Sequence, residues 1–266
     1  SGRTREVSVG GSNRRREQRS GAARGSSGAQ GAAIKPAWRE TFDAWGGYPV
    51  FVALLSAVLV VAVLFWVNRA GASAGKGDFT SVNHGPTKGR LAGNPDAPVK
   101  ILEFADFQCP YCKQFHDGTG KQLFEEYVSK GTVSFQFVSF AFIGPESQQA
   151  AEAAECAADQ GRFWDYHDLL YLRQGQENSG VFSKANLKRF AEELKRAIPD
   201  FDTKTFGECL DSGQKASVVA EQVKQARSAG VQSTPSFLVN GQALSGVQPI
   251  EAFRQAIDNA RKSAGK

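Results

Sequence analysis

The sequence of 266 residues contains no methionine, and only three histidines and four cysteines. Methionine is readily oxidised, so its absence suits a protein that works in an oxidising environment. Net positive charge is missing from most of the chain, although Lys and Arg outnumber Asp and Glu by 32 to 27. Residues 1–43 hold nine basic and four acidic residues, which leaves 23 of each sign in the other 223 positions. This balance argues against a nucleic-acid-binding domain, which needs clustered positive charge on its folded surface.

Charged residues are absent from residues 44–68. Within them, residues 48–67 read YPVFVALLSAVLVVAVLFWV, and a helix of this length spans about 30 Å, the thickness of a bilayer's hydrocarbon core. Trp45 and Trp66 lie near the two ends, where aromatic rings favour the membrane interface. We therefore expect a single transmembrane helix at residues 44–68. The alternative, a buried helix of a large soluble core, is rarely apolar on every side over such a length.

The flanking charges predict the orientation of this helix. Nine basic residues precede it, whereas only Arg69 and Lys76 follow closely. The positive-inside rule then predicts a cytoplasmic N-terminus in the cell membrane and an extracytoplasmic location for everything after residue 68. Residues 72–74 (ASA) resemble a signal-peptide cleavage site. The apolar run exceeds the roughly 7–15 residues of such signals, so we favour an uncleaved anchor.

Composition divides the remaining chain into three segments. The first 35 residues are rich in Gly, Ser, Ala and Arg and have few large apolar side chains, so residues 1–43 are predicted to be a disordered basic cytoplasmic tail. Residues 69–98 contain six glycines and three prolines and are predicted to be a flexible linker. The folded domain is expected at residues 99–266.

The start of the folded domain predicts a strand, a helix and a second strand. Residues 99–104 (VKILEF) are mostly apolar, and residues 132–140 (TVSFQFVSF) alternate and are rich in β-branched and aromatic side chains. Between them, a helical pattern runs from Cys109 to about Ser129, and Gly131 marks its end. Such a sequence of elements within about 40 residues indicates a parallel βαβ unit.

The rest of the domain first turns helical and then returns to strands. Helices are predicted at residues 146–159, 162–174, 183–196, 203–211 and 213–228. Residues 236–240 and 243–245 are predicted strands, and Asn240-Gly241 is typical of the hairpin between them. Pro249 opens a final amphipathic helix that continues to about Arg261. The predicted fold class is therefore α/β, in the order βαβ, helical block, ββα.

Cys109 and Cys112 form a CPYC motif directly after the first predicted strand and at the start of the predicted helix. The free N–H groups and the dipole at a helix N-terminus stabilise an anion, so the pKa of Cys109 should be depressed. Pro110 suits an early helical position and removes one N–H donor. Two cysteines three residues apart can close a small disulfide, and stabilisation of the reduced thiolate makes that disulfide an oxidant.

A metal site is the main alternative for a CxxC pair. Such a pair is half of a zinc site when a second pair, or histidines at ligand spacing, accompany it. His116 lies four residues after Cys112, where we expect a surface residue, and His84 and His167 are isolated in the sequence. We therefore expect no metal site.

Three separated motifs resemble the DsbA-like branch of the thioredoxin superfamily, a group of extracytoplasmic thiol–disulfide oxidoreductases. They are the VKILEF strand, the FADFQCPYC segment and the late TPSFLVNG segment. The resemblance covers about residues 86–262. It implies a thioredoxin fold with an inserted α-helical domain at about residues 145–228, and no cofactor.

The resemblance also implies a substrate-binding surface. Thr234-Pro235 matches the cis-proline loop that faces the CxxC motif in this family and pairs with an extended substrate peptide. Pro110 and Tyr111 would complete this surface. The alternative for Pro235 is an ordinary turn proline.

An acidic residue lies six positions before the first cysteine of the motif. Glu103 matches a buried acid of the family at this offset, and its implied role is to pass protons to or from Cys112. An acid in a buried strand is unfavourable unless it has a partner. The alternative is an exposed strand carboxylate.

Cys156 and Cys209 remain, and both lie in the helical block. In an oxidising compartment an even remainder of cysteines indicates a structural disulfide. Two buried free thiols are the alternative.

These features together predict a membrane-anchored oxidase that introduces disulfides into exported proteins. Its partners would be reduced exported proteins and a quinone-linked membrane reoxidant of the DsbB or VKOR type. One alternative is a disulfide isomerase or reductase on the same fold. Another is a non-catalytic tethered peptide-binding module, whose function a Cys109→Ser substitution would leave unchanged.

Overall fold

The computed structural model describes residues 47–70, 79 and 82–264. The predicted tail at residues 1–43 lies outside the described residues. α2 (Gly47–Ala70) is a helix of 24 residues, and its side chains are described at residues 52–63, where they are exposed. Within the described part of the chain, no helix is both long enough and apolar enough to cross a membrane. The anchor at residues 44–68 stays a prediction.

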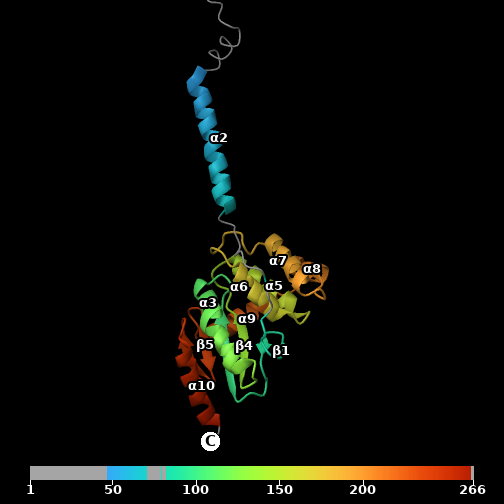
Figure 1. Cartoon of the computed structure of the whole chain (residues 1–266), viewed down its shortest axis with the longest axis vertical. Coiled ribbons are helices and arrows are strands. Elements are labelled where there is room, and N and C mark those ends of the chain that lie inside the picture. The colour runs from blue at the N-terminus through green and yellow to red at the C-terminus, as the bar shows by residue number, and fades with distance from the viewer. Residues whose placement is uncertain (1–46, 71–78, 80–81, 265–266) are drawn as a thin grey trace, which may run out of the picture. The chain divides into compact units, whose positions relative to one another are not determined.

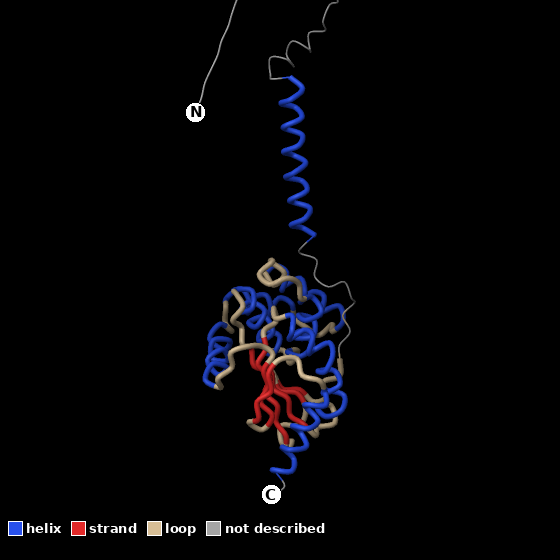
Figure 2. Tube along the Cα trace, turned by 90° about the vertical axis from the view of Figure 1, so that its left-hand side faces the viewer, coloured by secondary structure: helices blue, strands red, loops and turns tan. Residues whose placement is uncertain are grey.

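A six-stranded sheet in the order β1-β2-β4-β3-β5-β6 forms the centre of the folded domain (Figure 2). Its strands are β1 (Thr87–Lys88), β2 (Leu91–Ala92), β3 (Val99–Ala105), β4 (Val133–Ser139), β5 (Ser236–Val239) and β6 (Gln242–Ser245). β3 and β4 are parallel and all other neighbouring pairs are antiparallel, which confirms the predicted βαβ unit and the late hairpin. Asn240 and Gly241 both have positive φ, as the tight hairpin turn requires.

The helices of the folded domain match the predicted ranges closely (Figure 1). α3 (Pro110–Phe115), η1 (His116–Gly120), α4 (Lys121–Leu123) and η2 (Phe124–Val128) follow one another as a single helical segment with two π-helical stretches. After β4 come α5 (Pro145–Ala158), α6 (Phe163–Arg173), α7 (Lys184–Ala197), α8 (Thr203–Ser212) and α9 (Ala216–Ser228), and α10 (Ile250–Ala264) ends the domain.

One face of the sheet is covered by α3 and α10. Phe237 of β5 packs against Phe115 of α3, with ring centroids 4.6 Å apart, and against Phe253 of α10 at 5.0 Å. Glu103 of β3 is the register partner of Phe237, so the two side chains share this face. Because side chains alternate between the two faces of a strand, the Glu103 carboxyl group points toward the apolar layer under α3.

α9 covers the opposite face of the sheet. Ala226 of α9 forms a separate apolar cluster with Phe104, Val138 and Phe140. The predicted insertion at residues 145–228 is therefore too long, because its last helix belongs to the layers of the sheet. The inserted block is α5–α8, and these helices lie together beyond one end of the strands in Figure 1.

The predicted boundary between linker and domain at residue 98 is also wrong. Within the predicted linker at residues 69–98, β1 and β2 form a hairpin, and β2 joins the sheet where Ala92 pairs with Phe135 of β4. His84 and Ala97 are buried as well. Two-residue strands among glycines and prolines give no periodic signal, because alternation needs at least four residues to be recognised.

A disulfide between Cys156 of α5 and Cys209 of α8 confirms the predicted structural bond. The two residues are 53 positions apart in the sequence. In the chain-entropy model, closing a loop of this length stabilises the folded state by about 4 kcal/mol. The bond holds the first and last helices of the inserted block together.

Candidate functional site

The CPYC motif begins where β3 ends and α3 starts, as predicted. Cys109 is the N-cap residue of α3 and Pro110 is at its first turn. Cys109 is 5% exposed, Cys112 is completely buried, and both are free thiols. The carboxylate of Asp106 accepts hydrogen bonds from the backbone N–H groups of Gln108, Phe142 and Ile143 and so fixes the turn that leads into the motif.

The two thiols have opposite electrostatic environments. A hydrogen bond from Cys112 is the main reason that the pKa of Cys109 is lowered to about 6, and the Thr234 side chain and the N–H groups of Cys112 and Tyr111 also favour the thiolate against burial. Burial, together with the neighbouring Cys109, raises the pKa of Cys112 well above its ordinary value. The outer sulfur is therefore an anion at neutral pH, and the inner one keeps its proton.

The peptide bond between Thr234 and Pro235 is cis, as the family resemblance implies. The Cys109 thiol donates a hydrogen bond to the Thr234 carbonyl oxygen at 3.4 Å, so this loop faces the reactive sulfur. The Thr234 hydroxyl is buried without a hydrogen-bond partner in the described structure, which leaves it free to donate to a Cys109 thiolate. Tyr111 follows Cys109 by two residues. Its side chain is 62% exposed and offers an apolar surface to a substrate.

Glu103 is only 3% exposed, so the alternative of an exposed strand carboxylate is wrong. Burial raises the pKa of Glu103 to about 8, although the charge of His116 acts in the opposite direction. The two residues line a cavity of about 30 Å³, which has room for about one water molecule. A carboxyl group with this pKa can give or take a proton near neutral pH.

The structure overturns the description of the histidines as isolated. His84, His116 and His167 all contact the carboxylate of Asp168, at 2.8, 3.1 and 2.9 Å. Burial opposes ionisation of Asp168, but its hydrogen bonds from the three histidines hold its pKa well below the ordinary range. His116 is no free surface residue, since its side chain is 18% exposed. Sequence reasoning missed this cluster because its members lie on three distant segments.

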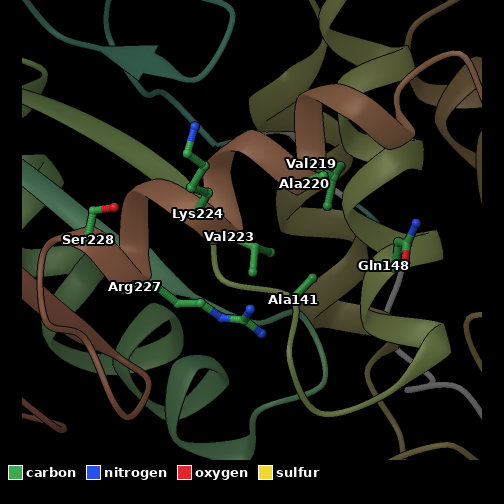
Figure 3. Close-up of a pocket in the computed structure, with 8 residues that line it drawn as sticks. All are labelled: Ala141, Gln148, Val219, Ala220, Val223, Lys224, Arg227 and Ser228. Carbon is green, nitrogen blue, oxygen red and sulfur yellow. The ribbon is translucent and has the colours of Figure 1, made fainter.

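One surface hollow lies away from the predicted redox residues. It has a volume of about 540 Å³ and is lined by Ala141, Gln148 of α5 and six residues of α9 (Figure 3). Arg227 of α9 extends toward Ala141 in this view. None of Cys109, Cys112 and Thr234 lines this hollow. The residues suited to thiol chemistry lie instead at the junction of β3, α3 and the cis-proline loop.

The sequence matches the thioredoxin family over residues 86–259. It is 38% identical over 179 residues to the Na(+)/H(+) antiporter NhaA 3 of Salinispora tropica, which covers 67% of this chain and 26% of that protein. It is 33% identical over 172 residues to the probable disulfide bond formation protein D of Bacillus anthracis, which covers 64% of this chain and 77% of the relative. Oxidised BdbD from Bacillus subtilis superposes with a TM-score of 0.60 at 27% identity, over 68% of this chain and 98% of that structure.

This chain thus spans only about a quarter of the antiporter that it matches but most of the disulfide bond formation protein. The segment that matches the thioredoxin family carries the CPYC motif and the cis-proline loop. The chain therefore belongs to the thioredoxin family.

Proposed function

We propose that this protein is an oxidase that introduces disulfide bonds into exported proteins on the outer side of the cell membrane. The observation that carries the proposal is the stabilised Cys109 thiolate at the start of α3, opposite the cis Thr234-Pro235 bond. A reduced form that is stabilised in this way makes the corresponding disulfide a strong oxidant. The name of the Bacillus anthracis relative, probable disulfide bond formation protein D, also supports an oxidase.

The reaction has two exchange steps. A substrate thiolate attacks Sγ of Cys109 in the Cys109–Cys112 disulfide, which forms a mixed disulfide and releases Cys112 as a thiolate that takes up a proton. A second substrate thiolate then attacks the substrate sulfur of the mixed disulfide, and Cys109 leaves as a thiolate. The substrate loses two electrons to the enzyme, whose two cysteines end reduced. Because a thiol of low pKa leaves readily, Cys109 favours the second step.

The loop before β5 supplies the place for an extended substrate. A peptide that approaches Cys109 meets the backbone of Thr234, and main-chain pairing there adds a strand without demanding a particular sequence. The exposed ring of Tyr111 and the exposed Pro110 flank the sulfur on the other side. This arrangement fits an enzyme that acts on many unfolded proteins.

Glu103 is proposed to carry the proton that Cys112 gains and loses. Cys112 is completely buried, so its thiolate must be protonated from within the protein. The two groups interact electrostatically, because Glu103 is among the charges that raise the pKa of Cys112. The small cavity beside Glu103 can hold the water that links this carboxyl group to solvent.

The reduced enzyme must pass its electrons on. We propose that a quinone-linked membrane protein of the DsbB or VKOR type reoxidises Cys109 and Cys112, and that residues 44–68 anchor the domain near it. The apolar sequence at residues 48–67 supports the anchor, as do the nine basic residues before it. Isomerase or reductase activity is the competing function, since the fold and motif allow either direction of exchange.

The pKa of Cys109 can be tested by alkylation. The rate of reaction of the reduced protein with iodoacetamide should follow a single titration with an apparent pKa of about 6. The Thr234→Val variant removes one donor to the thiolate and should raise this pKa by about one unit, as expected for a hydrogen bond to a charged group. Thr132→Val is the matched control, because the Thr132 hydroxyl donates to the Tyr127 carbonyl. A pKa near 9 in the unmodified protein would remove the basis of the proposal.

Equilibration with glutathione separates an oxidase from a reductase. The Cys109–Cys112 pair should have a potential more positive than about −180 mV, whereas thioredoxin-like reductases lie near −270 mV. The double variant Cys109→Ser/Cys112→Ser controls for the Cys156–Cys209 disulfide and should show no transition. A value close to that of thioredoxin assigns the protein to the reductases.

The Glu103→Gln variant tests proton transfer and stability together. Because folding raises the pKa of Glu103 from 4.5 to about 8, ionisation of this group destabilises the fold increasingly as pH rises from 4.5 to about 8. The amide cannot ionise, so the variant should gain stability over the unmodified protein at pH 8 but not at pH 4. Formation of the mixed disulfide, the step in which Cys112 leaves and takes up a proton, should slow about a hundredfold at neutral pH, as measured by rapid-mixing kinetics with a cysteine peptide.

The exposed Glu208 of α8 provides the control for this experiment. Glu208→Gln should change neither the pH dependence of stability nor the exchange rate, since the Glu208 side chain is 67% exposed. Unchanged kinetics in Glu103→Gln would refute the proton-transfer role and leave the cysteine chemistry intact.

Protease digestion of cells stripped of their wall tests the topology. Externally added protease should digest the domain after residue 68, while an epitope fused to the N-terminus should stay protected until the membrane is opened. The reverse pattern would mean that the CPYC motif faces the cytoplasm, where reducing conditions oppose disulfide formation.

A further inference from the structure

All three histidines of this 266-residue chain meet at one carboxylate. His84 precedes β1, His116 begins η1, and His167 lies in α6 beside Asp168. His84 Nε2 lies 2.8 Å from Asp168 Oδ2, while His116 Nε2 and His167 Nδ1 lie 3.1 and 2.9 Å from Oδ1. Convergence of every imidazole in the chain from three segments indicates a built site.

We propose that His116, His167 and Asp168 bind a zinc-type divalent metal ion, while His84 holds the other oxygen of the Asp168 carboxylate. Two imidazole nitrogens and one carboxylate oxygen suit Zn²⁺, which takes water as its fourth ligand in sites with three protein ligands. In a tetrahedral zinc site with bonds of about 2.0–2.1 Å, neighbouring ligand atoms are separated by about 3.3 Å. The ligand atoms of His116, His167 and Asp168 all lie within 4.8 Å of one another, which small rotamer adjustments bring to this geometry.

The surroundings of His116 have the form that metal-binding histidines usually show. Its second ring nitrogen, Nδ1, lies 3.0 Å from Asp117 Oδ1, and Lys113 Nζ lies 2.9 Å from the other oxygen of that carboxylate. A carboxylate that accepts the Nδ1 proton fixes the ring and directs the lone pair of Nε2 toward the metal position.

Aromatic rings enclose the cluster. The rings of Phe124 and Trp164 lie 4.9 and 5.0 Å from the ring of His84, and Trp164 also lies 4.9 Å from His167. His167 and Asp168 are each 4% exposed. An apolar shell of this kind keeps competing water from the ligands.

An ion can reach the cluster from the surface. The cavity of about 30 Å³ is lined by the three proposed ligands, by His84 and by Val82, which is 44% exposed. Its volume admits one ion or one water molecule. A bound ion would join the helical segment that starts with the CPYC motif to α6 of the inserted block.

The test uses tag-free, full-length protein in detergent, with Cys109 and Cys112 oxidised so that no thiol can bind metal. Zn²⁺ should bind in a 1:1 ratio by calorimetry, and Co²⁺ should give the visible absorption of a tetrahedral site that Zn²⁺ then abolishes. His167→Gln should weaken binding by at least about a hundredfold. Absence of saturable Zn²⁺ binding by the oxidised protein would mean a hydrogen-bonded network only and would overturn the proposal.

Asp117 and Asp211 form a matched pair for the case that the buried variant fails to fold. Both are exposed, at 46% and 55%, and both are paired with a lysine, Lys113 and Lys188. Asp117→Asn should weaken Zn²⁺ binding about tenfold because it removes the partner of His116 Nδ1, whereas Asp211→Asn should leave it unchanged. Equal affinities in the two variants would place the ion elsewhere and refute the site. Either result is independent of the redox function, since the assay measures metal binding alone.

Discussion

The structure around the CPYC motif depends on one constraint, which is that a largely buried sulfur at the start of α3 must carry a negative charge. Cys109 is 5% exposed, and its pKa still falls to about 6 because Cys112, Thr234 and the first N–H groups of the helix favour the anion. The main influences that lower it are hydrogen bonds from Cys112, Thr234 and Tyr111. Hydrogen bonds and the helix terminus therefore lower the pKa of Cys109, as a neighbouring cation does for other reactive thiols.

This constraint explains why the neighbouring groups stay neutral. A second anion next to Cys109 would raise its energy, and burial keeps protons on Cys112 and, below pH 8, on Glu103. The turn before the motif is held instead by Asp106, whose oxygens accept three backbone N–H groups. Of the two thiols, only Cys109 is thus ionised at neutral pH, while Cys112 and Glu103 keep protons that are available for the exchange.

Sequence alone predicts the parts of this site that local chemistry determines. The CPYC motif between a strand and a helix, the Thr234-Pro235 loop and the helical block all follow from patterns of ten to twenty residues. The β1–β2 hairpin does not, because strands of two residues have no periodicity and are stabilised by pairing with β4. The histidine cluster does not either, since His84, His116 and His167 are brought together only by tertiary packing. The assignment of α9 to the insertion fails for the same reason, because Ala226 of α9 contacts residues of β3 and β4, which precede the whole helical block in the chain.

The redox site and the histidine cluster are neighbours that interact electrostatically. Glu103 and His116 line the same cavity, and the positive charge of His116 lowers the pKa of Glu103. His116 is itself held by Asp117 and Asp168, so the position of its charge is fixed by groups that never touch a sulfur. Asp168 is among the groups that raise the pKa of His116, and Glu103 is among those that raise the pKa of Cys112, so electrostatic interactions connect the two clusters. The inserted helical block, which supplies Asp168, thus contributes to the electrostatics around the redox site.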